Sequence, residues 1–474
     1  MQLTFSSATR VALPALLGSL TLLGCSPDQV VPASSAGPLN VSQYLAVGDN
    51  YTAGYSDGGL TLSSQQYSIP ALLDQQFALT LGRVSTFPQP TLPEGTGTGY
   101  LRLQGFDASG LPQTKRVTTG RSTRGSFINP SACGGSADTT FLYSRATNTL
   151  PQNLGVPFMR LSQIETKGLG NEANLQRIGL FNPFLERLLP ANDERTYLQA
   201  VTDASASATF FTFSMGLGDV LPYLLSGGSC TSANPTSAAI SLMKANVKKI
   251  LDKVSDNGRR PGIIYLAPYS MNQLPILGRG SIARVQALAK SNDTIYVQAS
   301  TLSGAVLVRP MSAKNDYILP SGLAEFGKRQ NVVLPGGGTA SLRYGLHYRN
   351  PIKLRDVLDE GEFGRVNQAV TTINDEAVRL ADKVYKLPVI NRSVNGVNLY
   401  SQISLTPPFN GISVNGVKYT DELIRGNFYS LDQYSLTPRG NAIMANAIIR
   451  EINRFYKASI PLLDPNTLPT TAHP

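Results

Sequence analysis

Five short β-rich runs recur along the chain, and segments with helical periodicity lie between them. The runs cover Tyr44–Gly48, Asn153–Val156, Ala208–Met215, Pro261–Ala267 and Leu387–Ile390. The alternation of short strands with helices favours parallel βαβ units over a β-sandwich. The pattern therefore predicts an α/β domain with a parallel sheet.

Three helices are indicated by apolar stripes with the period of a helix. The first stripe comprises Ile240, Met243, Val247, Ile250 and Val254. The second, with steps that alternate between four and three, comprises Val366, Val370, Ile373, Ala377, Leu380 and Val384. The third helix follows Thr437–Gly440, reaches about Lys457 and carries Ala445, Ile448, Ile452 and Phe455 on one side. We expect the first two stripes to face the core and the third helix to close the domain.

Three stretches interrupt this pattern because they are poor in helix signal and rich in Gly, Thr, Ser and Pro. They lie near residues 86–149, 299–350 and 393–427. We interpret them as insertions on the loop side of the sheet, where α/β folds carry their binding surfaces. Residues 41–465 are predicted to form a single domain, followed by a tail at 466–474.

Residues 1–24 have the proportions of a secretion signal. Arg10 is their one charge, and the apolar run Val11–Leu23 is too short to span a bilayer. The run ends in Leu22-Leu23-Gly24-Cys25, which resembles the lipobox of bacterial lipoproteins. This resemblance implies cleavage before Cys25 and acylation of its thiol, and the Pro-, Ser-, Ala- and Gly-rich residues 25–40 are predicted to be a flexible tether. The alternative is an ordinary signal peptide with an incidental cysteine.

The composition of the chain limits which cellular compartment and which classes of partner are expected. The chain has 474 residues, 42% of them hydrophobic, enough to bury a large core, and a formal charge of +10 without a Lys/Arg run. No nucleic-acid partner is predicted, and a mildly basic surface is favoured over a specific anionic partner such as lipopolysaccharide phosphate. The lipid anchor would be the membrane contact of an outer-membrane lipoprotein that faces the periplasm or the cell surface.

Cysteine usage agrees with an exported protein. Cys133 and Cys230 remain once Cys25 is lipidated, and an even pair in an oxidising compartment favours a disulfide over two free thiols. Neither has a Cys or His at metal-binding spacing, so no zinc site and no cofactor are predicted.

Four sequence blocks carry a resemblance to a known family. Gly48–Tyr55 is similar to the Gly-Asp-Ser block of SGNH (GDSL) hydrolases, in which the serine attacks an ester or acyl carbonyl. Asn153–Phe158 and Gly216–Asp219 are similar to the blocks that supply the oxyanion hole, and Leu431–Gly440 is similar to the block whose Asp-x-x-His supplies the acid and the base. The resemblance implies a flavodoxin-like three-layer α/β/α sandwich with a parallel sheet and long loop insertions.

The family's catalytic positions are occupied by other residues, with one exception. The nucleophile position holds Asn50, and the oxyanion glycine and asparagine positions hold Phe158 and Gly218. Ser435 stands at the position of the basic histidine, while Asp432 matches the family acid. An amide has no nucleophilic oxygen, and a serine hydroxyl does not take up a proton near neutral pH. Loss of a triad's nucleophile or base costs about 10⁴- to 10⁶-fold in rate, so the resemblance implies a pseudoenzyme.

Other residues are weaker candidates for catalysis. His347 in an insertion is a candidate base, whereas His473 lies among the last two residues, and Ser56, Ser214 or Ser435 would have to act as a relocated nucleophile. Asp49, Asp219 and Asp432 would form an acid/base pair of glycosidase type if their carboxylates lay about 5–9.5 Å apart. The competing interpretation, which we prefer, is that these aspartates cap turns and helix starts.

Two functions follow from these patterns. The favoured one is a catalytically inactive surface lipoprotein that binds a glycan or lipid ligand, or serves as a subunit of an outer-membrane or surface complex with a β-barrel partner. The alternative is an esterase or acyl hydrolase for glycan or lipid esters with a non-standard active site. A structural role in a surface layer is compatible with the Tyr- and Thr-rich loops, but no residue distinguishes it.

Overall fold

A computed structural model describes residues 34–106, 112–119, 150–175, 177, 179–300, 305–393 and 398–473. These residues belong to one compact unit, Ser34–Pro474. The signal segment, Cys25 and Cys133 lie outside the described residues, as does most of the stretch 86–149.

The core of the unit is a five-stranded sheet, and its strands coincide with the five predicted runs. They are β1 (Tyr44–Gly48), β4 (Asn153–Gly155), β5 (Phe210–Ser214), β6 (Gly262–Tyr265) and β13 (Val389–Ile390). The spatial order is β13-β6-β5-β1-β4, and every neighbouring pair is parallel. The predicted α/β class with a parallel sheet is confirmed. Counted along the chain the order is 2-1-3-4-5, which is the order of flavodoxin-like sheets.

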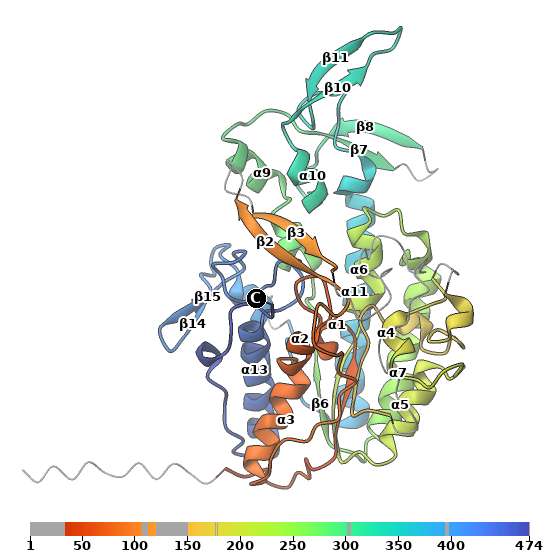
Figure 1. Cartoon of the computed structure of the whole chain (residues 1–474), viewed down its shortest axis with the longest axis vertical. Helices are drawn as coiled ribbons and strands as arrows, with labels where there is room; N and C mark the ends of the chain where they lie inside the picture. Colours follow the sequence, from red (N-terminus) through yellow and green to blue (C-terminus); the bar gives the residue numbers. More distant parts are fainter. Residues whose placement is uncertain are drawn as a thin grey trace, which may run out of the picture. The chain divides into compact units, whose positions relative to one another are not determined.

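Helices cover both faces of the sheet (Figure 1). On one side α3 (Ile69–Thr80) packs against α13 (Pro438–Tyr456). On the other side α7 (Ser237–Val254) packs against both α5 (Tyr197–Ser205) and α11 (Glu360–Leu380). The three helices predicted from apolar stripes are α7, α11 and α13, and all three are confirmed. One position of the second stripe was wrong: Val384 lies beyond α11 in the π-helical turn Ala381–Tyr385, whose wider winding turns it away from the stripe, and it is exposed instead of facing the core.

The long helices begin at residues that bind their first backbone N–H groups. Thr236 caps α7 by accepting from the N–H of Ala239. Asp359 caps α11 in a reciprocal pair with Glu362, and Thr437 caps α13 next to Pro438 at its first position. Such caps contribute about 1 kcal/mol each, so these local residues fix where each helix starts.

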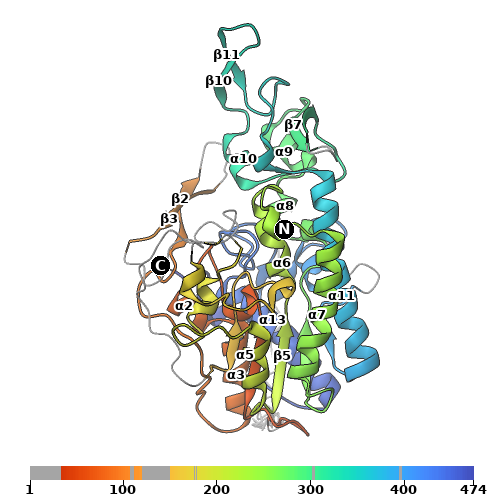
Figure 2. The same cartoon turned by 90° about the vertical axis from the view of Figure 1, so that its right-hand side faces the viewer.

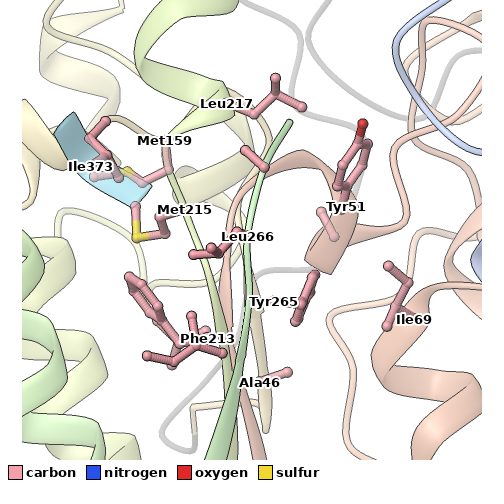
Figure 3. Close-up of a cluster of buried hydrophobic side chains, with 14 of the residues drawn as sticks. Ala46, Tyr51, Ile69, Met159, Phe213, Met215, Leu217, Tyr265, Leu266 and Ile373 are labelled. Atoms are coloured by element: carbon pink, nitrogen blue, oxygen red, sulfur yellow. The ribbon is translucent and has the colours of Figure 1, made fainter. Parts of the chain in front are cut away.

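Side chains of the sheet alternate between the two helical layers. Figure 3 shows Phe213 and Met215 of the β5 segment on the side of Ile373 from α11, and Tyr265 of β6 on the side of Ile69 from α3. All five side chains are buried. Because successive residues of a strand point to opposite faces, one short apolar run supplies both sides of the core.

The predicted insertions carry small hairpins and short helices. The first holds β2 (Tyr100–Phe106) and β3 (Pro112–Val117). The stretch near 299–350 holds β8 (Val306–Pro310), β9 (Tyr317–Ile318), α10 (Pro320–Glu325), β10 (Arg329–Val333) and β11 (Thr339–Arg343), and it is preceded by β7 (Tyr296–Ser300). The third holds α12 (Leu399–Ile403), β14 (Ile412–Val414) and β15 (Val417–Tyr419). The remaining elements are α1 (Asn50–Ala53), α2 (Leu62–Gln66), α4 (Pro183–Glu186), α6 (Leu217–Leu225), α8 (Pro275–Gly278), α9 (Ile282–Ala289) and β12 (Val357–Leu358).

A second, smaller core organises the segment around β7 to β11. Its buried members are Val285, Ile295, Val297, Met311, Ile318, Tyr344, Ile352 and Val357. Figures 1 and 2 both show the β10–β11 hairpin projecting from this segment, away from the parallel sheet. The stretch is therefore a small folded lobe rather than a loop.

Both ends of the described chain lie against the domain. Ser35 and Ser459 exchange backbone hydrogen bonds beside the end of α13, so part of the expected tether is docked. Near the other end, Ala472 and His473 are buried. Among the described residues, no helix is long and apolar enough to cross a membrane.

Candidate functional site

The residues that resemble the family blocks meet at the carboxyl ends of two adjacent strands. Gly48 of β1 pairs with Ser214 of β5, and the chain leaves these strands as Asp49-Asn50 and Gly216-Leu217-Gly218. In the order 2-1-3-4-5, β1 and β5 flank the point where the direction of winding reverses, and α/β sheets form their ligand crevice there.

Asn50, at the family's nucleophile position, is fully buried and begins α1. Its side-chain Oδ1 accepts a hydrogen bond from the N–H of Phe158 at 3.0 Å. Its Nδ2 has no partner in the described part of the chain. The amide therefore occupies an N–H that an oxyanion would need, and it holds the β1 and β4 loops together.

Phe158, at the position of the family's oxyanion glycine, has a φ of 58°. This left-handed region favours glycine, which has no Cβ to clash there. The Phe158 ring is buried, meets Tyr55 edge-on with centroids 5.2 Å apart, and lies 6.3 Å from Phe184. The backbone thus keeps a glycine-like conformation while the side chain fills the space beside the site.

Gly218, at the family's asparagine position, has no room for a side chain. A Cβ built on it would lie 2.2 Å from the carbonyl oxygen of Met159. Its N–H donates to Oδ2 of Asp49 at 2.8 Å, and the N–H of Gly216 donates to the same oxygen at 3.1 Å. The second potential oxyanion donor is therefore occupied as well.

Asp49 is buried where it receives these bonds. Burial raises its pKa to about 7, and the nearby Asp219 carboxylate adds to this rise. The N–H groups of Gly216 and Gly218 oppose the rise because they stabilise the charged form. Asp49 serves as the internal acceptor for the turn that follows β5.

Asp432, at the position that resembles the family's acid, is also bound by the chain itself. Its Oδ1 accepts from the N–H of Ser435 at 2.7 Å and of Tyr434 at 3.1 Å, and its Oδ2 accepts from the N–H of Gly58 at 2.8 Å. The Ser435 hydroxyl is fully buried and has no partner among the described residues. The two side chains do not form an acid–base pair, because Asp432 contacts the backbone of Ser435 and ties its loop to the loop after α1.

Asp219 completes the set of three carboxylates. It accepts from the N–H groups of Leu161 at 2.7 Å and of Ser162 at 3.1 Å, and burial raises its pKa to about 6. Each of the three aspartates thus binds the N–H groups of a neighbouring loop, as expected for turn and helix-start caps. Of the three, only Asp432 lines the cavity above the site.

A cavity of about 710 Å³ lies above these residues. Tyr55 and Tyr434 form part of its wall and stack with centroids 6.4 Å apart. Leu101, Thr114 and Arg116 from the β2–β3 hairpin, Ile276 of α8 and Leu319 before α10 also line it. Asn50, Phe158, Gly218 and Ser435 do not, so the four substituted family positions lie beneath the wall of an open cavity.

Sequence reasoning missed the residues that shape this cavity. Tyr55 and Tyr434 stand inside the family-like blocks, but nothing in their spacing predicts that they stack. Arg116 lies in a predicted insertion, and its guanidinium donates to the carbonyl oxygen of Gly58 at 2.7 Å. The sequence does place one tyrosine, Tyr55, five positions after the nucleophile position and another, Tyr434, beside the base position. This pair is the signal that could have indicated the cavity wall.

The other candidate bases and nucleophiles are placed elsewhere. His347 stacks on Tyr348 in a surface turn and is absent from the cavity wall. His473 is buried against Tyr100, with its Nε2 3.9 Å from Asp57, and burial lowers its pKa to about 4. Ser56 donates its hydroxyl to the carbonyl oxygen of Leu436.

Cys230 is buried and disulfide-bonded, and Cys133 lies outside the described residues, so the Cys133–Cys230 pairing stays a prediction. In the described ranges no group of three or more His, Cys, Asp or Glu residues is arranged to hold a metal ion. No family model, no curated protein and no solved structure matches the chain.

Proposed function

We propose that the protein is a catalytically inactive, ligand-binding surface lipoprotein built on an SGNH-like scaffold. One observation carries this proposal: the four substituted family positions are buried and hydrogen-bonded or packed within the chain, while a cavity of about 710 Å³ stays open above them. This arrangement is expected of a protein that has lost its catalytic activity but has kept its binding cavity.

The geometry argues against a cryptic hydrolase. The N–H of Phe158 is bound to Asn50 and the N–H of Gly218 to Asp49, so neither is available to an oxyanion. Hydrolases of this kind need such donors about 2.7–3.1 Å from the developing charge. Rebuilding the family residues would not restore them, because an asparagine at Gly218 would collide with the backbone of Met159.

The lining of the first cavity suits a glycan or lipid ligand. The stacked Tyr55 and Tyr434 rings and the side chains of Leu101 and Leu319 supply apolar surface against which a sugar ring or an acyl chain can pack. Arg116 adds a guanidinium to the wall. The lipobox at Cys25 and the tether that follows it support placement on a membrane, with an outer-membrane β-barrel or surface complex as partner.

The binding half of the proposal is tested with Leu101→Trp, a change that fills the first cavity. Purified protein would be titrated with glycans and with short-chain lipids, and we expect Leu101→Trp to abolish the binding seen for the wild type. Leu103→Trp is the matched control, because Leu103 lies on the same strand but does not line the cavity. Equal loss in both variants, or no ligand for the wild type, would refute the binding role.

The catalytic half is tested with short-chain and acetyl-sugar esters. We expect no turnover above background for the wild type, and none for Asn50→Ser combined with Ser435→His. Robust turnover that is lost in Asp432→Ala would establish the alternative, an esterase with a non-standard site. Turnover that survives both Asp432→Ala and His347→Ala would locate the chemistry outside this site.

A further inference from the structure

A second cavity, of about 1090 Å³, lies apart from the site described above. Its walls come from the β2–β3 hairpin near Phe106, from the segment between α8 and α9, and from the loop that holds Asp421 and Arg425. It shares no lining residue with the first cavity. The two cavities draw on the same hairpin and on α8, but a ligand bound here would contact no residue that lines the first cavity.

Three arginines line this second cavity: Arg279, Arg284 and Arg425. They come from two segments that are distant in the sequence. No hydrogen bond and no ion pair is made by any of the three guanidinium groups within the described ranges. Arg279 is also partly buried, and burial together with the nearby Arg284 cation lowers its pKa.

Several arginines elsewhere in the protein are paired with carboxylates, and others donate to backbone carbonyl oxygens, as Arg260 does to Ala208 at 2.7 Å. Arg379 binds Glu376 at 2.6 Å, Arg454 binds Glu451 at 2.6 Å and Arg195 binds Asp193 at 2.6 Å. Arg392 binds Asp382 at 2.5 Å. A partly buried arginine is normally satisfied in this way because its desolvated charge is costly. Arg279 departs from this rule, and the exposed Arg284 and Arg425 add two further cations to the same cavity that have no partner in the described structure.

The acidic residues of the cavity do not supply the missing partners. Asp421 accepts from the Ser404 hydroxyl and from the N–H of Leu405, both at 3.1 Å. Glu422 attracts Arg279 electrostatically but makes no ion pair with it in the described structure. The cavity therefore holds three arginines against two carboxylates, one of them already bound to the chain.

We propose that the second cavity binds a tetrahedral oxyanion, a phosphate or sulfate group, through Arg279, Arg284 and Arg425. Guanidinium groups recognise such groups through charge-assisted hydrogen bonds from their planar N–H forks. Three guanidinium groups that line one cavity suit a group with several charged oxygens, whereas a planar carboxylate is satisfied by a single fork. The oxyanion is free in solution, attached to a sugar, or part of a lipid headgroup.

The experiment is calorimetric titration of the full mature protein with inorganic phosphate and with glucose 6-phosphate, with glucose as the neutral control. Phosphatidylglycerol vesicles are compared with phosphatidylcholine vesicles in a sedimentation assay. Binding of inorganic phosphate, of the sugar phosphate or of the anionic vesicles would identify the source of the oxyanion. Each of these three results supports the site. No binding of any of these probes at low salt would overturn it.

Substitutions decide whether the arginines make the site. Arg279→Gln with Arg284→Gln is expected to weaken binding by about tenfold or more, since hydrogen bonds to charged groups are the strong class. Arg329→Gln with Arg450→Gln removes the same charge from exposed positions that line neither cavity, and it should leave the affinity unchanged. Equal weakening in both double variants would show a nonspecific charge effect and overturn the proposal.

Two further variants separate binding from folding. Arg425 is exposed and comes from a different loop, so Arg425→Gln should weaken binding while the melting temperature stays unchanged. Arg279→Lys keeps the charge and should retain more affinity than Arg279→Gln. If Arg425→Gln and Arg279→Gln, each tested alone, both kept full affinity, the proposed site would be contradicted.

Discussion

Two groups of polar side chains differ in what they bind. One is the floor beneath the first cavity, which comprises Asp49, Asn50, Asp219 and Asp432, and the other is the set of arginines in the wall of the second cavity. On the floor, the carboxylates of Asp49, Asp219 and Asp432 and the Oδ1 atom of Asn50 have partners inside the chain. On the wall of the second cavity, three guanidinium groups have none in the described structure. Bonds inside the chain make the first arrangement a stabilising one, although Asn50 Nδ2 and Ser435 Oγ have no partner in the described structure. In the second, Arg279 is half-buried and Arg284 and Arg425 are exposed, so their N–H groups can reach a ligand in the cavity.

Removing the best-bonded acceptor on the floor should have the largest effect. Asp49→Ala leaves the N–H groups of Gly216 and Gly218 buried without an acceptor. Each such loss costs about 1–3 kcal/mol, so we expect the free energy of unfolding to fall by about 3–5 kcal/mol in urea denaturation. Asp203→Ala, which removes a half-exposed partner of Arg195, should cost less than about 1 kcal/mol. Equal costs would mean that the floor is not held by Asp49.

The pH dependence of stability should report the same carboxylate. Burial raises the pKa of Asp49 from 3.8 to about 7, so between about pH 4 and 7 the folded state binds more protons than the unfolded state. Stability should therefore fall as the pH rises through this window, by at most about 4 kcal/mol from Asp49, and level off above it. Asp49→Asn should remove the Asp49 share of this fall in melting curves taken from pH 4 to 8. The carboxyl groups of Asp57, Asp219 and Glu362, whose pKa values burial also raises, should keep the remainder.

His473 gives the pH experiment an internal contrast. Its folded pKa of about 4 lies below the ordinary 6.5, so its contribution to stability is present above pH 6.5 and is lost as the pH falls toward 4. His473→Gln should remove this loss of stability at low pH. It should leave the fall of stability that Asp49 causes at rising pH in place. If one variant alone removed both pH-dependent changes in stability, the assignment of these changes to Asp49 and His473 would be contradicted.

The fold was predictable because its signals are local. Each of the five strands and the helices α7, α11 and α13 has its own apolar period, and a period reports burial without reference to distant residues. The lobe around β7 to β11 was missed because its small core is assembled from residues spread between Val285 and Val357. No single stretch of that segment carries a strong period.

The site was predictable in part for the same reason. The blocks placed Asn50, Phe158 and Gly218 at adjacent strand ends, and the structure brings them together. Their hydrogen bonds, and the stacking of Tyr55 on Tyr434, depend on loops far apart in the sequence, which a pattern cannot pair. The arginine cluster was hidden likewise, because overall composition favoured a diffuse basic surface over a local anion site.

Phe158 offers a finer test of how the floor is built. Phe158→Ala should cost about 3–5 kcal/mol through the cavity it leaves. Phe158→Gly should cost about 1 kcal/mol less, although glycine is smaller, because a φ of 58° strains any residue with a Cβ. Phe213 in strand β5 is the control, since there glycine should be worse than alanine. The same order at both positions in urea denaturation would show that backbone strain at Phe158 is unimportant.

The smallest effect is expected on the wall of the second cavity. Arg279→Gln removes a cation that has no partner in the described structure and is repelled by Arg284, so the free energy of unfolding should stay within about 0.5 kcal/mol of the wild type or rise slightly. Arg309→Gln is the matched change at a satisfied arginine. Arg309 donates to the fully buried Asp316 carboxylate at 2.8 Å, and its loss should cost about 3 kcal/mol. If the two substitutions destabilised the protein equally, Arg279 would be a structural residue like Arg309, and the contrast between the bound carboxylates beneath the first cavity and the unpartnered arginines of the second would fail.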